Sequence, residues 1–416
     1  MRGGAGVSRI ESSPAPRTPS GDGTSPGGQL LAAYLHARAG DFLRGLRLYG
    51  ERGAESAGAA GTTGAALSLR MAARRISATL HTFRPLLDVA WADGLRTELA
   101  WVSGTLAQEH ACTARLERLL EALGRLSGTG EAVSGAEAQP ESESESESVP
   151  GQRGQSRNKA TAGALAIGAA RAGALLERQL NLARTRAHST TLQALGSARL
   201  HAVADGVALL ASELPLSPAA KPHRNGSAGI LDGLGGLDVL EGQALLAEER
   251  LWKAVSLLPL ARAGHPYNAD ALVNGLATAS AEEVQDTPWH QVRILLRLHR
   301  YAGEVLQQPA AQGFGGMATE VELRLDGRDP RAGLGFGGRD PAASAALRRA
   351  GRLLDRHRDA AEAAAAATAA ARTPRIAPAT AYALGVLHAD QRHEVEAARF
   401  AFHEVWQTSF AVQAGR

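Results

Sequence analysis

Apolar side chains recur at helical spacing along long stretches of this chain. In the first stretch they fall on one face of a single helix: Leu31, Tyr34, Leu35, Phe42, Leu46 and Tyr49. Hydrophobic residues make up 44% of the chain but aromatic residues only 4%, so small aliphatic side chains must fill the core. No convincing alternating pattern, the sign of a strand, interrupts these stretches. The sequence therefore predicts an all-α fold with closely packed helices.

Segments rich in Gly, Pro or Ser separate the predicted helices. The helices are expected over about residues 30–49, 66–87, 93–126, 164–188, 191–214, 239–262, 269–279, 288–307, 343–372 and 379–408. The glycine-rich run 53–64 should end the first helix. Thr287 is placed to cap the helix at 288–307, with Pro288 as its first residue.

Composition divides the chain into one helical domain and two tails. We expect a disordered N-terminal tail, a helical domain in two halves and a C-terminal tail: 1–27, 28–410 with halves 28–214 and 239–410, and 411–416. Three segments interrupt the domain: the acidic low-complexity linker 127–160, the loop 215–238 with its Pro, Gly and Asn residues, and the Gly-rich loop 308–342.

Net charge and cysteine usage limit the possible settings of the protein. The formal net charge is only +3, but the Glu-Ser repeat at 141–148 leaves the rest of the chain more basic. The single cysteine, Cys112, excludes an internal disulfide and is expected to be a small buried side chain. The N-terminal residues lack the apolar region of a signal peptide, and no apolar run is long enough to span a membrane. These features favour a cytoplasmic protein without a membrane partner.

An internal repeat places arginines at matching positions of two predicted helices. Arg70 and Arg74 in the segment 67–77 correspond to Arg293 and Arg297 in the segment 290–300. In the second segment, one helix face carries only basic residues: His290, Arg293, Arg297 and Arg300. Like charges three or four residues apart destabilise a helix, so a bound anion would explain the pattern. The alternative is a solvated face of an ordinary amphipathic helix.

The two basic segments resemble the signature helices of the CHAD family, the conserved-histidine α-helical domain. The sequence RMAARRISATLHTFRPLL at 70–87 is similar to the first signature helix, and WHQVRILLRLHRYAGEVL at 289–306 is similar to the second. The resemblance covers most of residues 28–410 apart from the linker and the loops. It implies two pseudo-symmetric antiparallel helical bundles that form one unit, with a shared basic groove. It also implies binding of inorganic polyphosphate there, without catalysis, and association with polyphosphate granules.

The resemblance also identifies the residues expected to bind polyphosphate. They are Arg70, Arg74, Arg75, His290, Arg293, Arg297, Arg300 and Tyr301. The planar guanidinium group suits phosphate contacts better than the lysine ammonium group does. The chain departs from the family pattern where Leu67 replaces a histidine and where Ser77 and Leu298 replace arginines. A scaffold protein whose groove no longer binds polyphosphate is therefore an alternative.

Other motifs give weaker indications. Residues 319–325 imitate a strand of the CYTH triphosphatases, but a Gly-rich loop has no room for that β-tunnel, so we expect no catalytic residues. His388 and His393, with Asp390 and Glu394 nearby, are five residues apart and poorly spaced for metal binding, so we expect exposed side chains, no metal and no cofactor. Nucleic acid is a further possible ligand, disfavoured because aromatic stacking platforms are missing.

Overall fold

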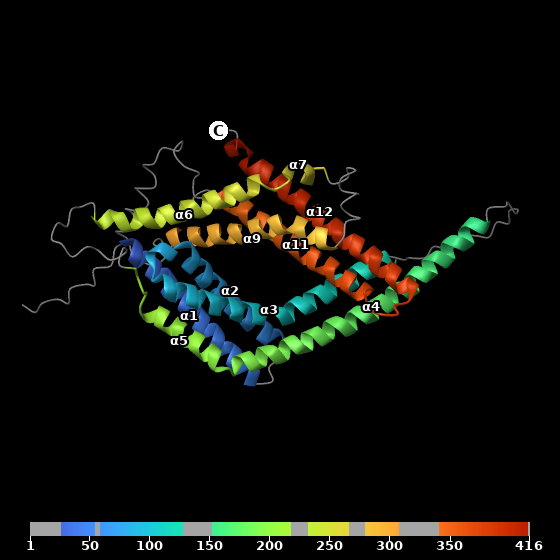
Figure 1. Cartoon of the computed structure of the whole chain (residues 1–416), viewed down its shortest axis with the longest axis horizontal. Helices are drawn as coiled ribbons and strands as arrows, with labels where there is room; N and C mark the ends of the chain where they lie inside the picture. The colour runs from blue at the N-terminus through green and yellow to red at the C-terminus, as the bar shows by residue number, and fades with distance from the viewer. Residues whose placement is uncertain are drawn as a thin grey trace, which may run out of the picture.

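The computed structural model describes residues 26–54, 59–127, 152–217, 232–265, 279–307 and 341–414. Its helices are α1 (Pro26–Ala54), α2 (Ala59–Thr82), η1 (Arg84–Leu86), α3 (Val89–Leu126), α4 (Gln152–Leu195), α5 (Ala198–Ser212), α6 (Asp232–Ser256), α7 (Leu260–Ala263), α9 (Ala279–Gln307), α11 (Pro341–Ala371) and α12 (Pro378–Ala414). The only β-pairing in these ranges is an isolated bridge between Leu87 and Leu216. The predicted all-α class is confirmed (Figure 1).

The first hydrophobic core lies among α1, α2, α3 and α5. Fully buried side chains such as Phe42, Leu69 and Phe83 fill it. The start of α6 and the end of α9 add Leu240 and Val305 to the same core. Helices from the second half of the chain therefore complete the core of the first half.

Two further cores join the remaining helices. One is aromatic and lies among α6, α7, α9, α11 and α12, where Phe402 stacks on Trp406 with ring centroids 5.5 Å apart. The other consists mainly of alanine and leucine and joins α3 and α4 to α11 and α12. Because α6 and α9 contribute to two cores and α3 packs against α11, the two halves of the chain interlock (Figure 1).

Two glycines within helices lie where a neighbouring helix approaches closely. A Cβ atom at Gly45 of α1 would lie 3.3 Å from the backbone of Leu69 in α2. A Cβ atom at Gly168 of α4 would lie 2.3 Å from the carbonyl oxygen of Ala379 in α12, which is impossibly close. Glycine at these positions allows the close helix packing that a core of small side chains requires.

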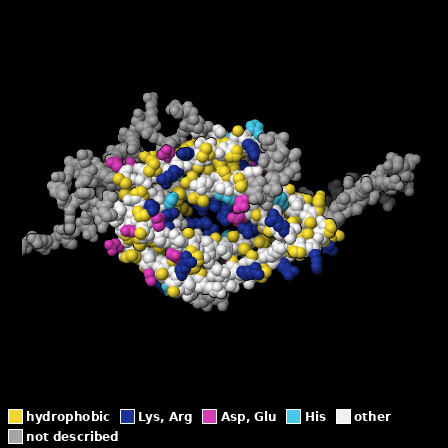
Figure 2. Space-filling model, viewed as in Figure 1, with side chains coloured by type: hydrophobic (Ala, Val, Ile, Leu, Met, Phe, Trp, Pro, Cys, Tyr) yellow, Lys and Arg dark blue, Asp and Glu magenta, His cyan; other side chains and the backbone are white. Residues whose placement is uncertain are grey.

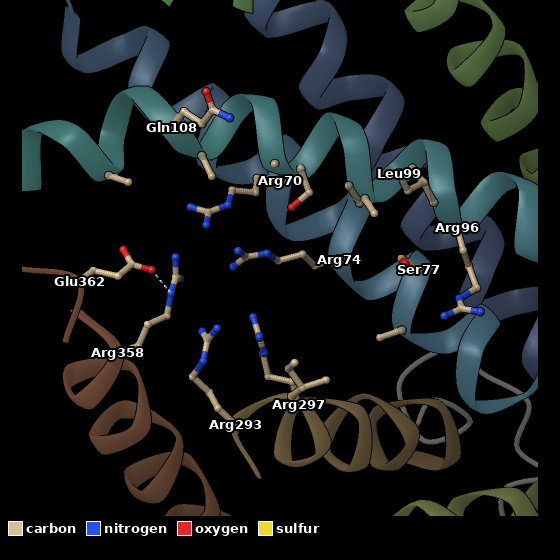
Figure 3. Close-up of a pocket in the computed structure, with 18 of the residues that line it drawn as sticks. Arg70, Arg74, Ser77, Arg96, Leu99, Gln108, Arg293, Arg297, Arg358 and Glu362 are labelled. Carbon is tan, nitrogen blue, oxygen red and sulfur yellow. Dashed lines mark hydrogen bonds and ion pairs between the residues drawn. The ribbon is translucent and has the colours of Figure 1, made fainter. Parts of the chain in front are cut away.

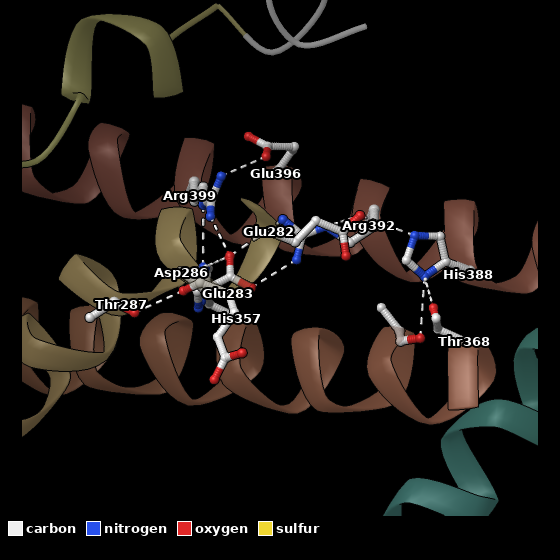
Figure 4. A network of polar contacts seen from close by, with 11 residues as sticks. Glu282, Glu283, Asp286, Thr287, His357, Thr368, His388, Arg392, Glu396 and Arg399 are labelled. Carbon is white, nitrogen blue, oxygen red and sulfur yellow. Dashed lines mark hydrogen bonds and ion pairs between the residues drawn. The ribbon is translucent and has the colours of Figure 1, made fainter. Parts of the chain in front are cut away.

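The start of α9 differs from the prediction. The helix begins at Ala279 rather than at residue 288, so Pro288 lies inside it and Thr287 is no cap. The Thr287 hydroxyl instead donates to the carbonyl oxygen of Glu283. The added turns carry Glu282 and Asp286 into a buried group of charged side chains with α12 (Figure 4). These tertiary contacts hold the helix together despite the proline, which lacks a backbone N–H.

The break between α4 and α5 also differs from the prediction. It lies at Gly196 and Ser197, not at residues 189–190. The hydroxyls of Ser189 and Thr190 donate to carbonyl oxygens four residues earlier, which is compatible with a continuing helix. The Ser197 side chain accepts from the backbone N–H of Leu200 and caps α5.

Several expected loops and tails are shorter than predicted. Helix begins at Pro26 and at Ala59, inside the expected tail and the glycine-rich run. It also begins earlier than expected at Gln152, Asp232 and Pro341, and α12 continues to Ala414. The rest of the acidic linker and Gly-rich loop, the segment 319–325 and residues 269–278 lie outside the described residues.

Within the described residues, no single helix is long and apolar enough to cross a membrane. The segments Ala166–Leu195 and Ala198–Ser212 pass that test only as a pair, which is bent by 60°.

A candidate anion site lined by arginines

A cavity of about 900 Å³ is lined by residues of α2, α3, α9 and α11 and by two alanines of α4. Figure 2 shows a central hollow where Lys and Arg side chains gather. Seven arginines from the described residues line the cavity: Arg70, Arg74, Arg96, Arg115, Arg293, Arg297 and Arg358. Glu362 is the one carboxylate among the described residues that line it. The cavity is therefore strongly cationic.

The two copies of the sequence repeat meet at this cavity. Arg70 and Arg74 project from α2, and Arg293 and Arg297 project from α9, which packs against α2. Four-residue spacing places each pair on one face of its helix. Figure 3 shows the guanidinium groups of these residues and of Arg358 pointing toward one another. The sequence-based expectation that these four arginines share one concave surface agrees with the structure.

Three of the cavity arginines have no acidic partner within the part of the chain that the structure describes. They are Arg70, Arg74 and Arg297. Burial lowers the pKa of Arg74 to about 10, and the nearby charge of Arg70 acts in the same direction. Burial also lowers the pKa of Arg297 to about 10, and the charges of Arg293 and Arg74 act in the same direction. The cavity therefore holds these cations at an electrostatic cost.

Other basic residues of the two repeat segments pair with carboxylates of neighbouring helices. Arg293 Nη1 lies 3.0 Å from Asp355 Oδ1 of α11. Arg75 Nε lies 3.0 Å from Glu304 Oε2 of α9. Because these acids stand on neighbouring helices, the spacing within one helix could not predict them.

Glu362 forms two ion pairs at one side of the cavity. Its Oε1 accepts from Arg358 Nε and its Oε2 accepts from Arg115 Nη2, each at 2.6 Å. Arg358 and Glu362 belong to α11, whereas Arg115 belongs to α3. In Figure 3, Glu362 and Arg358 lie on one side of the arginine cluster, and Ser77 and Arg96 lie on the other.

Of the remaining predicted site residues, one lines the cavity and three do not. Tyr301 lines the cavity, and its ring lies 5.5 Å from the Arg75 guanidinium group. Arg75, His290 and Arg300 are not among the residues that line it. The His290 ring lies 5.6 Å from that of His357, and burial lowers the His290 pKa. The role of all these residues in binding stays a prediction.

The three residues that depart from the family pattern do not all lie in the cavity. Ser77 and Leu298 line the cavity, where they replace expected arginines with a hydroxyl and an apolar side chain. Leu67 is 37% exposed on α2 and does not line it. Two of the three departures therefore change the lining itself.

Sequence reasoning missed three cavity arginines. Arg96 and Arg115 come from α3, and Arg358 comes from α11. None belongs to the internal repeat. The only sequence signal at Arg358 was a glutamate four residues later, the spacing of a helical ion pair.

Two expectations about single residues are wrong. Cys112 is half-buried and lines the cavity instead of filling a core. His388 is not an exposed polar residue, because its Nε2 lies 3.1 Å from Glu282 Oε1 and its Nδ1 lies 2.9 Å from Thr368 Oγ1. Asp390 and Glu394 are also partly buried and lie beside arginines. Among the described residues, no group of three or more His, Cys, Asp or Glu could hold a metal ion.

Comparison with known proteins agrees with this architecture. A family model described as the CHAD domain matches residues 53–315. Among solved structures, the chain is similar to PptA from Streptomyces chartreusis, with 48% sequence identity and a TM-score of 0.62. That similarity covers 92% of this chain and 99% of PptA. No match was found among curated proteins. The extent of the family match and the identity to PptA show that this chain belongs to the CHAD domain family.

Proposed function

We propose that the arginine-lined cavity binds inorganic polyphosphate and that the protein does so without catalysis. The observation that carries this proposal is the cluster of Arg70, Arg74 and Arg297, which lack acidic partners among the described residues. Each guanidinium group offers a planar set of donors that matches phosphate oxygens. A chain of phosphates would supply several negative charges at once and so relieve the repulsion among these cations.

Buried donor atoms support the same proposal. Arg70 Nε and Arg293 Nε are buried and have no hydrogen-bond partner among the described residues. A buried polar atom without a partner destabilises a folded protein by about 1–3 kcal/mol. Phosphate oxygens reaching into the cavity would satisfy such donors.

Nucleic acid fits the cavity less well. Proteins that bind single strands combine basic grooves with aromatic side chains on which bases stack. Tyr301 is the one aromatic ring apart from His81 among the described residues that line the cavity. A bare phosphate chain needs no such stacking surface, so the lining favours polyphosphate over RNA or DNA.

A scaffold protein with a degenerate groove is the second alternative. Ser77 and Leu298 favour it, because each removes a cation that the family pattern would place in the lining. The cavity nevertheless keeps seven arginines from the described residues. We therefore propose that binding persists and that the protein acts in the cytoplasm, where it associates with polyphosphate granules.

Competitive binding tests the proposal directly. The full chain would be titrated with long-chain polyphosphate, duplex DNA, single-stranded DNA and single-stranded RNA at the same low salt concentration, with fluorescence anisotropy as the readout. The proposal predicts that polyphosphate binds most tightly and displaces the other three. Equal or tighter binding of a nucleic acid would favour the nucleic-acid function, and no binding of polyphosphate by folded protein would favour the scaffold.

A further inference from the structure

We propose that Glu362 ends the path of the phosphate chain in this cavity and thereby limits how many arginines a polyphosphate engages. The inference rests on the proposed polyphosphate function and adds a determinant of ligand length to it. It arises from one contrast within the cavity: Arg70, Arg74 and Arg297 have no acidic partner among the described residues, whereas Arg115 and Arg358 are held by Glu362, a carboxylate that lines the cavity itself.

The geometry of Glu362 shows why it would compete with phosphate. Its two oxygens accept short hydrogen bonds from Arg358 Nε and Arg115 Nη2, so one carboxylate neutralises two guanidinium groups and takes one donor from each. A phosphate group would bind these guanidinium groups through the same kind of anionic oxygen acceptor. Glu362 therefore stands where the next phosphate of a chain would have to bind.

Glu362 also remains charged. Burial raises its pKa, but the charges and hydrogen bonds of Arg358 and Arg115 outweigh this effect, and the pKa lies below its ordinary value. A phosphate group placed beside the ionised carboxylate would be repelled, and displacing the carboxylate would strand it partly buried, since its side chain is only 32% exposed. The phosphate path is thus closed at this side.

Asp355 does not act in the same way, although it also pairs with a cavity arginine. Its side chain is 57% exposed, it makes one contact to Arg293, and it does not line the cavity. The Arg293 side chain is only 12% exposed, but Asp355 lies at the surface and can turn into solvent when a competing anion binds Arg293. Arg293 therefore remains open to phosphate together with Arg70, Arg74 and Arg297. The seventh arginine, Arg96, is not counted with these four, because it pairs with Asp93 and lies apart from the cluster (Figure 3).

The central test replaces Glu362 by glutamine. Glu362→Gln keeps the shape of the side chain and one hydrogen-bond acceptor but removes the charge. The proposal predicts tighter binding of long-chain polyphosphate, on the order of tenfold at low salt. The log-log salt slope should become steeper by about 1.4, since two more contacts at about 0.7 each become available. Tripolyphosphate, which is too short to extend past the unpaired arginines, should gain much less.

A charge-matched control is available in the same region. Glu394 of α12 lies 2.5 Å from Arg356 of α11 and 3.6 Å from Arg118 of α3, so it joins the same two helices as Glu362 does. It does not line the cavity. Glu394→Gln should leave the salt slope for long-chain polyphosphate unaltered. Equal effects of the two variants would mean that only the overall charge matters, and would overturn the proposal.

A purely structural role for Glu362 predicts the opposite sign. If Glu362 only held Arg358 and Arg115 in a binding conformation, Glu362→Gln would weaken polyphosphate binding and flatten the slope, which overturns the proposal. Adding Arg115→Gln to Glu362→Gln should remove about half of the gained slope, because one of the two freed contacts is lost.

The unaltered protein supplies a test that needs no variant. Four open arginines predict a salt slope of about 2.8 for long-chain polyphosphate. A slope near 4.2, which needs about six contacts, would show that phosphate already reaches Arg358 and Arg115 and would overturn the proposal. Failure of the proposed function can be told apart from failure of this inference in the variant titrations and in the salt-slope measurement. If the proposed function is wrong, the unaltered protein binds no polyphosphate at all.

Discussion

Asp286 of α9 accepts a hydrogen bond from Arg392 of α12, with 2.8 Å between Oδ2 and Nη1, and both side chains are buried. Arg399 also donates to Asp286, and His357 of α11 lies 3.6 Å from it (Figure 4). Three helices therefore meet at one buried carboxylate. The same contacts hold Pro288 within α9, one turn before the arginines of the cavity.

Asp286→Ala should unfold the protein more easily because it removes the buried carboxylate that Arg392 and Arg399 share, and leaves them only Glu282 and Glu396 as acidic partners among the described residues. The expected loss of unfolding free energy is about 3–5 kcal/mol, the range typical of broken buried ion pairs. Asp355→Ala removes an exposed partner of Arg293 and should change stability by less than about 1 kcal/mol. Urea unfolding of both variants measures the difference. Similar losses would show that the buried group does not anchor α9.

Mild acid should destabilise the protein through two buried histidines. Burial lowers the pKa of His299 and of His357 to about 4 in the folded state, although the hydrogen bond to Asp286 partly opposes this at His357. In the unfolded chain each histidine takes up a proton near pH 6.5. The contribution of the two neutral, buried histidines to the free energy of unfolding is therefore fully present above that pH. It is lost as the pH falls toward 4, by about 3 kcal/mol for each histidine.

Unfolding free energies measured from pH 7 to pH 4.5 test this prediction, with His299→Leu as the variant. The His299 side chain is 5% exposed, and its pKa shift has burial as its one cause. His299→Leu should therefore make stability less sensitive to pH. An unaltered pH dependence in His299→Leu would contradict the assignment of this loss to His299.

Glu248 of α6 should make the protein less stable as the pH rises, which is opposite to the effect of the two histidines. Its side chain is 4% exposed, and burial raises its pKa to about 7 despite a hydrogen bond from Trp252. The folded state therefore holds a proton that the unfolded state releases near pH 4.5, and stability falls as the pH rises toward 7. Glu248→Gln should stabilise the protein at pH 8 by up to about 3 kcal/mol and much less at pH 4.5. Thermal unfolding at the two pH values checks this; equal shifts would contradict it.

Ser77→Arg should tighten polyphosphate binding, because residue 77 lines the cavity beside Arg74. One additional phosphate contact contributes up to about 1 kcal/mol, or several-fold in affinity. Leu67→His also restores a residue of the family pattern, but Leu67 does not line the cavity, so its effect should be smaller. Titrations at one salt concentration compare the two. A larger effect of Leu67→His would place the binding surface elsewhere on α2.

Helical periodicity predicted the fold well because it reports on each helix separately. The spacing of apolar residues in α1, and the match of Arg70 and Arg74 with Arg293 and Arg297, were visible in the sequence. The helix boundaries that were predicted wrongly depend on tertiary contacts. Pro288 would ordinarily begin a helix, and the buried contacts of Glu282 and Asp286 explain why α9 begins earlier.

The candidate site was partly predictable for the same reason. The repeat identified the arginines of α2 and α9, but nothing in it pointed to Arg358 and Arg115 or to their carboxylate Glu362. Those residues reach the cavity from α11 and α3 through the packing of helices far apart in sequence. The same packing leaves Arg75 and His290 outside the lining, although their helix positions suggested otherwise.

The salt dependence of polyphosphate affinity, compared between the unaltered protein and Arg293→Ala/Arg297→Ala, tests the central claim most directly. Phosphate contacts release counterions, so losing two of four contacts should weaken binding and lower the log-log slope from about 2.8 to about 1.4. Arg171→Ala/Arg178→Ala removes two exposed arginines of α4 that do not line the cavity and should leave the slope unaltered. Binding that persists with an unaltered slope in Arg293→Ala/Arg297→Ala would contradict polyphosphate binding in this cavity.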